Sequence, residues 1–304
     1  MPVLSILACR MLEDELASLL FADREVRELL LVDGKDSLSL SAKLKAKNRP
    51  HLLLSLEEIA QHLRVRGLKA GKAGISAPGA GRRTEELIVV VRPLALGLHS
   101  DLDRLRTAAY DGIQSLCPFS DRILIFYGKC GGVLANLERD LPGLPCPISF
   151  LADESGARIE DCIALALGGN ECYDRALAEH QDAALFMTPM WASNWRAMGQ
   201  EDAAAGKGRD LSATIRASGM KKVVRIDTGL RFEPGFEEKV DGFAKDFGLQ
   251  RIDMPGGTAL AKGCYEIAKA SLTAARPENV RPETRRNGLF ECLQEILRVV
   301  RRMT

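Results

Sequence analysis

The chain has 304 residues, of which 46% are hydrophobic, with 42 lysines and arginines against 41 aspartates and glutamates. That length suffices for a full hydrophobic core, in one large domain or two smaller ones. The balanced charge offers no broad attraction to nucleic-acid phosphates or anionic membranes. No apolar run approaches the roughly 20 residues that a membrane span needs. We therefore expect no nucleic acid and no membrane among the partners.

The N-terminal stretch MPVLSILACRMLEDEL has neither a basic lead-in nor a small-residue cleavage site. We therefore expect no secretory signal and a cytoplasmic protein. In that compartment cysteines are kept reduced. The prediction is that all eight are thiols: Cys9, Cys117, Cys130, Cys146, Cys162, Cys172, Cys264 and Cys292.

Short apolar runs alternate with helical patterns along the chain. The runs expected to form strands are 3–8, 29–32, 87–91, 123–127, 148–151, 184–187, 223–226 and 251–254. A helix is expected over 98–116, and another directly after Gly132. The alternation predicts an α/β fold with a largely parallel sheet flanked by helices. We expect two similar lobes with a cleft between them, an N-terminal one over 1–150 and a C-terminal one over 151–304.

Two segments depart from this alternation. Residues 64–86 are rich in Gly, Ala and basic side chains and predict a surface loop, or a lid if they lie beside a site. Residues 288–304 carry an apolar stripe flanked by arginines, which predicts a C-terminal helix. That helix would close the core of its own chain, with packing on a second subunit as the alternative.

Two cysteines stand where predicted strands end. Cys9 follows the first apolar run, and Cys130 lies in the turn 128–132, GKCGG, between a strand and a helical pattern. Ligands of parallel sheets bind at the carboxyl ends of strands, and glycine permits a close backbone approach or a positive φ. We therefore expect both thiols to be presented to a site.

Cys162 is the third candidate, because Asp161 suits the N-cap of an apolar helix that ends at Gly168. A thiol in the first helical turn is expected to have a lowered pKa. Three soft sulfur ligands that leave an open position suit zinc or an iron–sulfur cluster. The spacing itself is no metal signature, since the chain contains no C-x-x-C, so the convergence of the three thiols is a hypothesis.

For every thiol the alternative is a place in the core as a small apolar residue. Cys264 shares a helix face with Leu260 and Ile267, which favours the core. It also follows the turn 255–258, PGGT, and is for that reason the candidate for a fourth metal ligand.

Two further motifs are candidates for cofactor binding. In TPMWASNW, Thr188 can cap a helix on which Trp191 and Trp195 share a face, either as an aromatic wall for a flat ligand or as an apolar face packed on the sheet. In the turn 255–258, the backbone N–H groups of Gly256, Gly257 and Thr258 could hold a phosphate or carboxylate, a plain tight turn being the alternative. No P-loop and no G-x-G-x-x-G occurs.

Four motifs together carry a family resemblance: ACRMLEDEL, YGKCGG, DCIALALGG followed by Tyr173, and FMTPMWASNW. In this order, over 1–265, they resemble the family labelled domain of unknown function 1638. The resemblance implies that cysteines at the positions of Cys9, Cys130 and Cys162 recur together in family members. It also implies that members occur in organisms that use corrinoid-dependent methyl transfer. The family pattern often has a histidine before the Asp-Cys pair, whereas this chain has Glu160, which puts a histidine ligand there in doubt.

The resemblance and the thiols together predict a cysteine-ligated metalloprotein of one-carbon metabolism. As an enzyme, it would be a metal-dependent methyltransferase acting on a small-molecule substrate. The alternative is a non-catalytic accessory protein that carries zinc or an iron–sulfur cluster and docks on a corrinoid protein.

Overall fold

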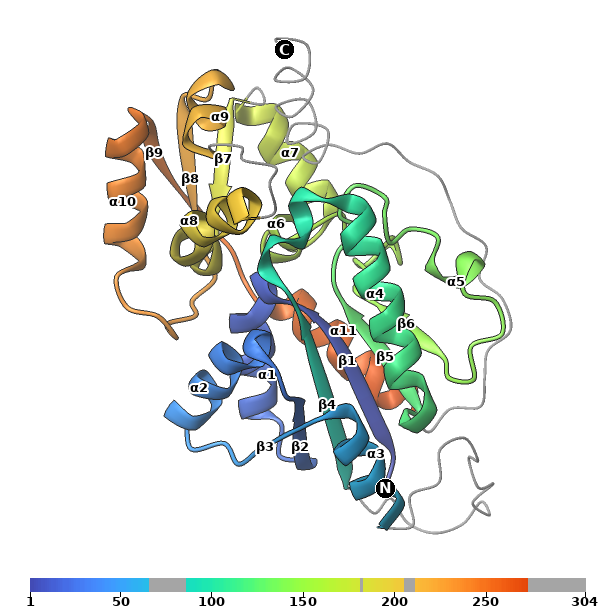
Figure 1. Cartoon of the computed structure of the whole chain (residues 1–304). Coiled ribbons are helices and arrows are strands. Elements are labelled where there is room, and N and C mark those ends of the chain that lie inside the picture. The colour runs from blue at the N-terminus through green and yellow to red at the C-terminus, as the bar shows by residue number, and fades with distance from the viewer. Residues whose placement is uncertain (66–85, 181–182, 205–210, 273–304) are drawn as a thin grey trace.

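The computed structural model of the chain describes residues 1–65, 86–180, 183–204 and 211–272 (Figure 1). Almost all of the predicted loop 64–86, and the whole predicted helix 288–304 with Cys292, lie outside these residues. Among the helices that are described, none has the length and apolar character needed to cross a membrane.

Six strands form the larger sheet, in the order β3-β2-β4-β1-β5-β6, and all neighbouring strands are parallel. They are β1 (Val3–Cys9), β2 (Val26–Val32), β3 (Leu52–Leu54), β4 (Leu87–Leu94), β5 (Arg122–Phe126) and β6 (Ile148–Phe150). Every residue of β1 and of β5 is buried. This explains the continuous apolar runs, since strands covered on both faces do not alternate with polar residues.

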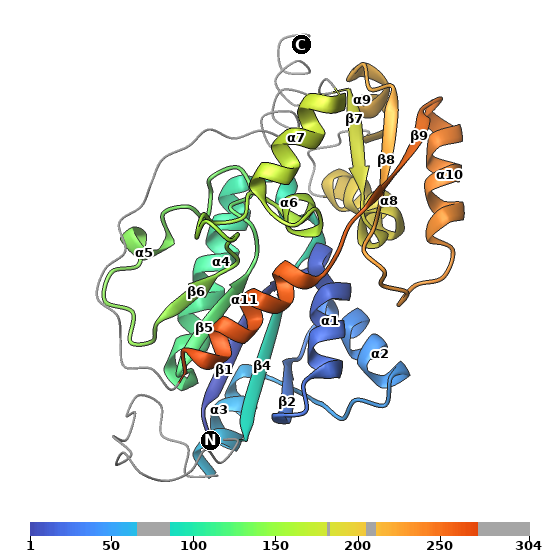
Figure 2. The same ribbon diagram turned by 180° about the vertical axis from the view of Figure 1, so that it is seen from behind.

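Helices cover both faces of this sheet, with α4 (Leu102–Leu116) on one face and α1 (Glu13–Ala22) with α11 (Ala259–Ala270) on the other (Figures 1 and 2). The other helices before the second sheet are α2 (Leu38–Ala46), α3 (Leu56–Val65), α5 (Leu137–Asp140), α6 (Cys162–Ala166) and α7 (Asn170–His180). Short 3₁₀ helices occupy Arg10–Leu12, Lys35–Ser37, Leu96–Ser100 and Cys117–Phe119.

A second parallel sheet has the order β7-β8-β9. Its strands are β7 (Ala184–Met187), β8 (Lys222–Asp227) and β9 (Gln250–Pro255), and its helices are α8 (Pro189–Ala204), α9 (Leu211–Ala217) and α10 (Phe236–Phe247). It has a small core of its own around Trp195, Val240 and Phe243. The strands of the two sheets run toward each other, so that their carboxyl ends meet in the middle of the molecule (Figure 1).

The last described helix, α11, returns from the second sheet to the first. Tyr265 donates a hydrogen bond of 2.8 Å to the carboxylate of Asp23, and Lys269 pairs with the same carboxylate at 2.6 Å. The larger sheet thus ends at β6, close to the predicted boundary at residue 150, yet it is covered by a helix from the second half of the chain.

The predicted α/β class with a largely parallel sheet is confirmed, and the eight predicted strands are present. The two sheets are unequal, with six strands against three, so the halves of the chain are not similar lobes. The predicted cleft between them stays a prediction. Sequence reasoning missed β3, which is only three residues long, and placed the start of α4 four residues too early, where a 3₁₀ turn lies.

A disulfide joins Cys117 and Cys146 across a Cα–Cα distance of 5.7 Å. The prediction that all eight cysteines are thiols is therefore wrong for this pair. Cys117 lies in the turn after α4 and Cys146 in the segment before β6. The sequence shows no sign of their contact, because it arises from the packing of α4 beside β5 and β6. Cys9, Cys130, Cys162, Cys172 and Cys264 take part in no disulfide.

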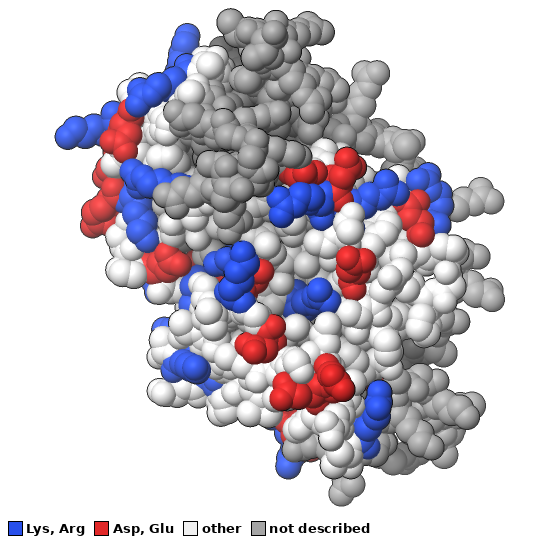
Figure 3. Space-filling model, in the orientation of Figure 1, with Lys and Arg blue, Asp and Glu red and all other residues white. Residues whose placement is uncertain are grey.

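The face seen in Figure 3 carries lysines and arginines interspersed with aspartates and glutamates over its described part. This mixture agrees with a formal net charge of +1 for the chain.

Candidate metal centre

The central strand β1 delivers Cys9 to the carboxyl edge of the larger sheet. Cys9 is the last residue of the strand, pairs in register with Leu94 of β4, and is 3% exposed. On the other side of β1, Phe126 of β5 pairs with Ala8. The next residue, Tyr127, is buried and its side chain interacts with the thiol of Cys9. Neighbouring strand ends thus bring a thiol and a phenol together, as parallel pairing dictates.

The turn after β5 has an unusual backbone at Cys130. Its φ is 45°, and Gly131 and Gly132 follow with φ values of 73° and 80°. A positive φ is uncommon for a residue with a Cβ and tends to occur at functional sites. These three residues also explain why the predicted helix does not begin directly after Gly132: the chain makes a turn, and α5 starts only at Leu137.

Gly128 allows the turn after β5 to lie directly on the segment that precedes α6. A Cβ at this position would lie 2.6 Å from Cα of Asp161 and 2.6 Å from the carbonyl oxygen of Glu160. The N–H of Cys130 donates to that same carbonyl over 2.9 Å. The close backbone approach predicted for this glycine turn is therefore present, and it brings Cys130 toward Cys162.

Cys162 is the first residue of α6. Oδ1 of Asp161 accepts hydrogen bonds from the N–H groups of Ile163 at 2.8 Å and Ala164 at 2.9 Å, which confirms the predicted N-cap. The side chain of Tyr173 lies near the same carboxylate and lowers its pKa, whereas burial raises that pKa to about 6 overall. From α8, Nε1 of Trp191 donates to Sγ of Cys162 over 3.4 Å. The sulfur is thus oriented by groups from two different elements.

The three thiols interact with one another. Burial raises the pKa of Cys9 to about 12 and, together with the neighbouring thiols, raises the pKa of Cys130 well above its usual range. Burial, Asp161 and Cys9 do the same to the pKa of Cys162. The lowered pKa expected for Cys162 from its helix position is therefore wrong, because loss of hydration outweighs the first-turn N–H groups.

The chemical nature of the three side chains suits a soft metal ion. Thiolates are the preferred ligands of zinc and iron–sulfur clusters, and a bound cation supplies the charge that buried thiols need in order to ionise. Among the described residues, however, no three His, Cys, Asp or Glu side chains are arranged to hold a metal ion. The structure therefore assembles the donors without showing a formed coordination geometry.

Cys264 lies apart from this arrangement. Its sulfur donates to the carbonyl of Ala152 at 3.1 Å and accepts from the N–H of Ala152 at 3.4 Å. With 6% exposure on α11, it occupies the core position that its helix face predicted. We leave it out of the candidate site.

The two tryptophans of α8 have different neighbours. Trp191 reaches Cys162, whereas Trp195 packs edge-on against Phe243 with 5.0 Å between ring centroids. Trp195 therefore belongs to the core of the smaller sheet.

The turn 255–258 has little donor capacity left for an anion. The N–H of Gly256 donates to the carbonyl of Asp227 at 3.0 Å, and the N–H of Gly257 to that of Ala166 at 2.8 Å. Thr258 precedes α11 as its N-cap residue. This is the arrangement of a tight turn, and its role in cofactor binding stays a prediction.

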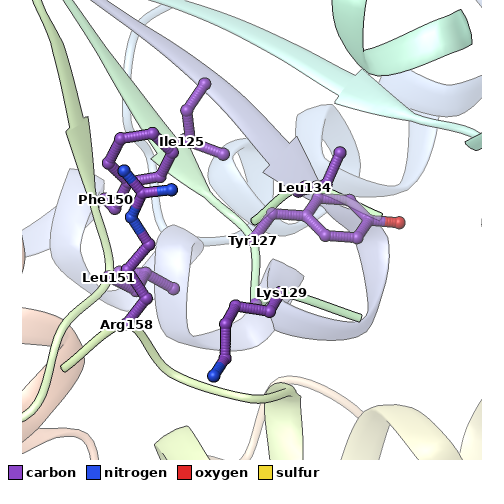
Figure 4. Close-up of a pocket in the computed structure, with 8 residues that line it drawn as sticks. Ile125, Tyr127, Lys129, Leu134, Phe150, Leu151 and Arg158 are labelled. Carbon is purple, nitrogen blue, oxygen red and sulfur yellow. The ribbon is translucent and has the colours of Figure 1, made fainter. Parts of the chain in front are cut away.

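A small pocket lies beside Tyr127, the residue that follows β5 (Figure 4). Lys129, Phe150 and Arg158 line it together with Tyr127. The Tyr127 hydroxyl points away from Phe150 and Arg158 in this view. Lys129 forms an ion pair with Glu160, and Arg158 pairs with Glu138 at 2.7 Å.

Sequence reasoning missed two buried residues that affect the thiols electrostatically, Tyr127 and Glu15. Tyr127 looks like the last residue of an apolar strand. Glu15 lies in the acidic run Glu13 to Glu15, which resembles a solvated helix start, but all three residues are buried because α1 packs against α2, α8 and α11. Only that packing distinguishes them from surface residues.

No curated protein and no solved structure matches the chain significantly. A family model does match, over residues 94–265, and its description is protein of unknown function (DUF1638). The matched region contains Cys130, Cys162 and Trp191. Since it covers more than half of the 304 residues, the chain belongs to the DUF1638 family.

Proposed function

We propose that the chain is a metalloprotein whose metal is held by Cys9, Cys130 and Cys162. The observation that carries the proposal is the electrostatic interaction among three thiols outside any disulfide, two of them buried and Cys162 partly buried, which come from three separate segments of the chain. A positive φ is strained for a residue with a Cβ, and packing a small apolar side chain into the core does not require it at Cys130.

The metal of this proposal is zinc or the iron of an iron–sulfur cluster. With three protein donors, a zinc ion keeps an open fourth position, as catalytic zinc sites do. When bound, it would lower the pKa of a thiol substrate there and so generate a nucleophile. The Trp191 N–H and the Tyr127 hydroxyl would orient the sulfur atoms, and the surrounding burial would exclude water.

The reaction that we propose is transfer of a methyl group to such a thiol in corrinoid-linked one-carbon metabolism. Its support is the family resemblance together with the soft donor set. A non-catalytic carrier of zinc or an iron–sulfur cluster that docks on a corrinoid protein is the second candidate. The burial of the site favours this second reading, since Cys9 and Cys130 are only 3% and 4% exposed.

Anaerobic purification of the full chain, followed by metal analysis and a visible absorption spectrum, tests the proposal. We expect zinc in a colourless protein or iron with sulfide in a brown one. Zinc that increases methyl transfer from a methylated corrinoid to a thiol would support the enzyme, whereas a brown, inactive protein would support the carrier. A preparation that contains no metal and takes up neither Zn²⁺ nor Co²⁺ would contradict both.

A further inference from the structure

Residues 158–160 form the segment that lies against the turn after β5 and leads into α6. The N–H of Lys129 donates to the carbonyl of Ile159 at 2.8 Å. The N–H of Cys130 donates to the carbonyl of Glu160 at 2.9 Å. Two successive backbone hydrogen bonds therefore align this segment with the turn that carries one of the three thiols, and the segment then leads into the helix that carries another.

The side chain of Asn170 binds the same segment from a different element. Asn170 is the first residue of α7. Its Oδ1 accepts from the N–H of Glu160 at 2.9 Å, and its Nδ2 donates to the carbonyl of Arg158 at 3.0 Å. With one acceptor and one donor, the side-chain amide binds the segment as a backbone amide of a neighbouring strand would.

The polar backbone groups from the carbonyl of Arg158 to the carbonyl of Glu160 all have partners as a result. The N–H of Ile159 donates to the carbonyl of Leu151 at 3.0 Å, and the turn after β5 supplies the donors for two carbonyls. The remaining pair of groups is bound by Asn170. Since Ile159 is fully buried, the loss of this side chain would leave two backbone groups without protein partners beside the core, which is unfavourable.

We infer that Asn170 is a positioning residue that holds the segment 158–160 in register with the turn after β5 and so fixes the spacing between Cys130 and Cys162. It acts on the thiols through the backbone of this segment. The contacts are those of the protein itself, and only their consequence for metal binding rests on the proposed function. Groups outside the coordination shell that orient the ligands contribute to metal affinity in this way.

Amide hydrogen exchange and Co²⁺ titration of the full chain and of Asn170→Ala test the inference. We expect the amides of Lys129, Cys130 and Glu160 to exchange at least about tenfold faster in the variant, because local opening becomes easier when two backbone groups lose their partners. The amides of β1 and β4 should stay protected over the same labelling times. Co²⁺ affinity, followed by sulfur-to-cobalt charge-transfer absorption, should fall at least about tenfold.

Two further variants separate positioning from a general loss of stability. Asn170→Asp keeps the acceptor for the N–H of Glu160 but offers no donor to the carbonyl of Arg158, so its exchange rates and Co²⁺ affinity should lie between those of wild type and Asn170→Ala. Asn194→Ala is the matched control, because Nδ2 of Asn194 donates to the carbonyl of Met190 at 2.8 Å within α8. It should keep the wild-type Co²⁺ affinity.

The outcomes distinguish this inference from the proposed function. Wild-type exchange of the Cys130 amide in Asn170→Ala would overturn the inference and leave the three-thiol proposal standing. Faster exchange with unchanged Co²⁺ affinity would also overturn it, since Asn170 would then serve the fold alone. A wild-type chain that binds no Co²⁺ would overturn the proposed function, and with it the role of Asn170 in metal binding.

Discussion

The indole Nε1–H of Trp191 donates a hydrogen bond to Sγ of Cys162 over 3.4 Å. It connects α8, which packs on the smaller sheet, to the first residue of α6. The smaller sheet thereby contributes a side chain to a site whose thiols come from elements on the larger one. Hydrogen bonds to a ligand sulfur tune both its orientation and the charge that it carries.

This contact predicts the behaviour of Trp191→Phe. The ring is retained but the donor is lost, so we expect Zn²⁺ affinity to fall by roughly tenfold, measured by competition with a chromophoric chelator. Trp195→Phe is the control. It lies in an aromatic cluster with Phe243 and Phe247, and should lower stability without changing affinity. Equal affinities in wild type and Trp191→Phe would show that the indole serves only packing.

Gly128→Ala should disturb the site through the backbone. The new methyl group would lie 2.6 Å from Cα of Asp161, so the segments that carry Cys130 and Cys162 must separate. We expect a loss of about 1–3 kcal/mol in the free energy of unfolding, together with reduced metal retention. Urea denaturation and metal analysis measure the two effects.

The control for that change is Gly242→Ala in α10, where the methyl group meets nothing within 4 Å. In an open helical position alanine stabilises by up to about 1 kcal/mol. If Gly128→Ala proved as stable as this variant, the tight approach between the two segments would be contradicted.

Cys264→Ser should leave metal binding unchanged. Its hydroxyl can make both hydrogen bonds that the thiol makes with Ala152, so the change in unfolding free energy should stay below about 1 kcal/mol. Metal analysis of the purified variant measures whether it retains the wild-type metal content. Loss of metal would restore Cys264 as the fourth ligand predicted from sequence.

Asp23 should make stability depend on acid pH. Burial tends to raise the pKa of this carboxyl, but hydrogen bonds from Lys269, from the N–H of Glu25 and from Tyr265 outweigh it, so the pKa is lowered overall. A lowered pKa stabilises the fold above the unfolded value of about 3.9, and that stabilisation disappears as the pH falls through the folded value.

Urea unfolding of wild type and Asp23→Asn at pH 6 and pH 3 measures this effect. We expect the wild type to be more stable at pH 6 by about 1–2 kcal/mol, and the advantage to shrink at pH 3. An advantage of the same size at both pH values would mean that the charge of Asp23 does not hold α11 on the larger sheet.

The fold class could be predicted from sequence because buried parallel strands appear as short, continuous apolar runs. Cys9, Cys130 and Cys162 could be placed at element ends for the same reason, with Asp161 as a recognisable cap. The turn at Cys130 was harder to predict, since the apolar spacing after Gly132 suggests a helix while three successive positive φ values delay it.

Other features depend on contacts between distant parts of the chain. Glu13, Asp14 and Glu15 look like an ordinary acidic helix start, and only the packing of α1 against α2, α8 and α11 buries them. The Cys117–Cys146 disulfide similarly needs the packing of α4 beside β5 and β6. Sequence position predicted a lowered pKa for Cys162, but the degree of burial reverses the direction.

The central claim is that Cys9, Cys130 and Cys162 hold one metal, and metal stoichiometry in single variants tests it most directly. Cys9→Ser, Cys130→Ser and Cys162→Ser would be purified anaerobically beside Cys172→Ser as the matched control, since Cys172 is a partly buried thiol of α7 outside any disulfide. The account predicts that the control retains wild-type metal and that each of the other three loses most of it while staying folded by circular dichroism. Full metal occupancy in Cys130→Ser, or equal loss in Cys172→Ser, would contradict the account.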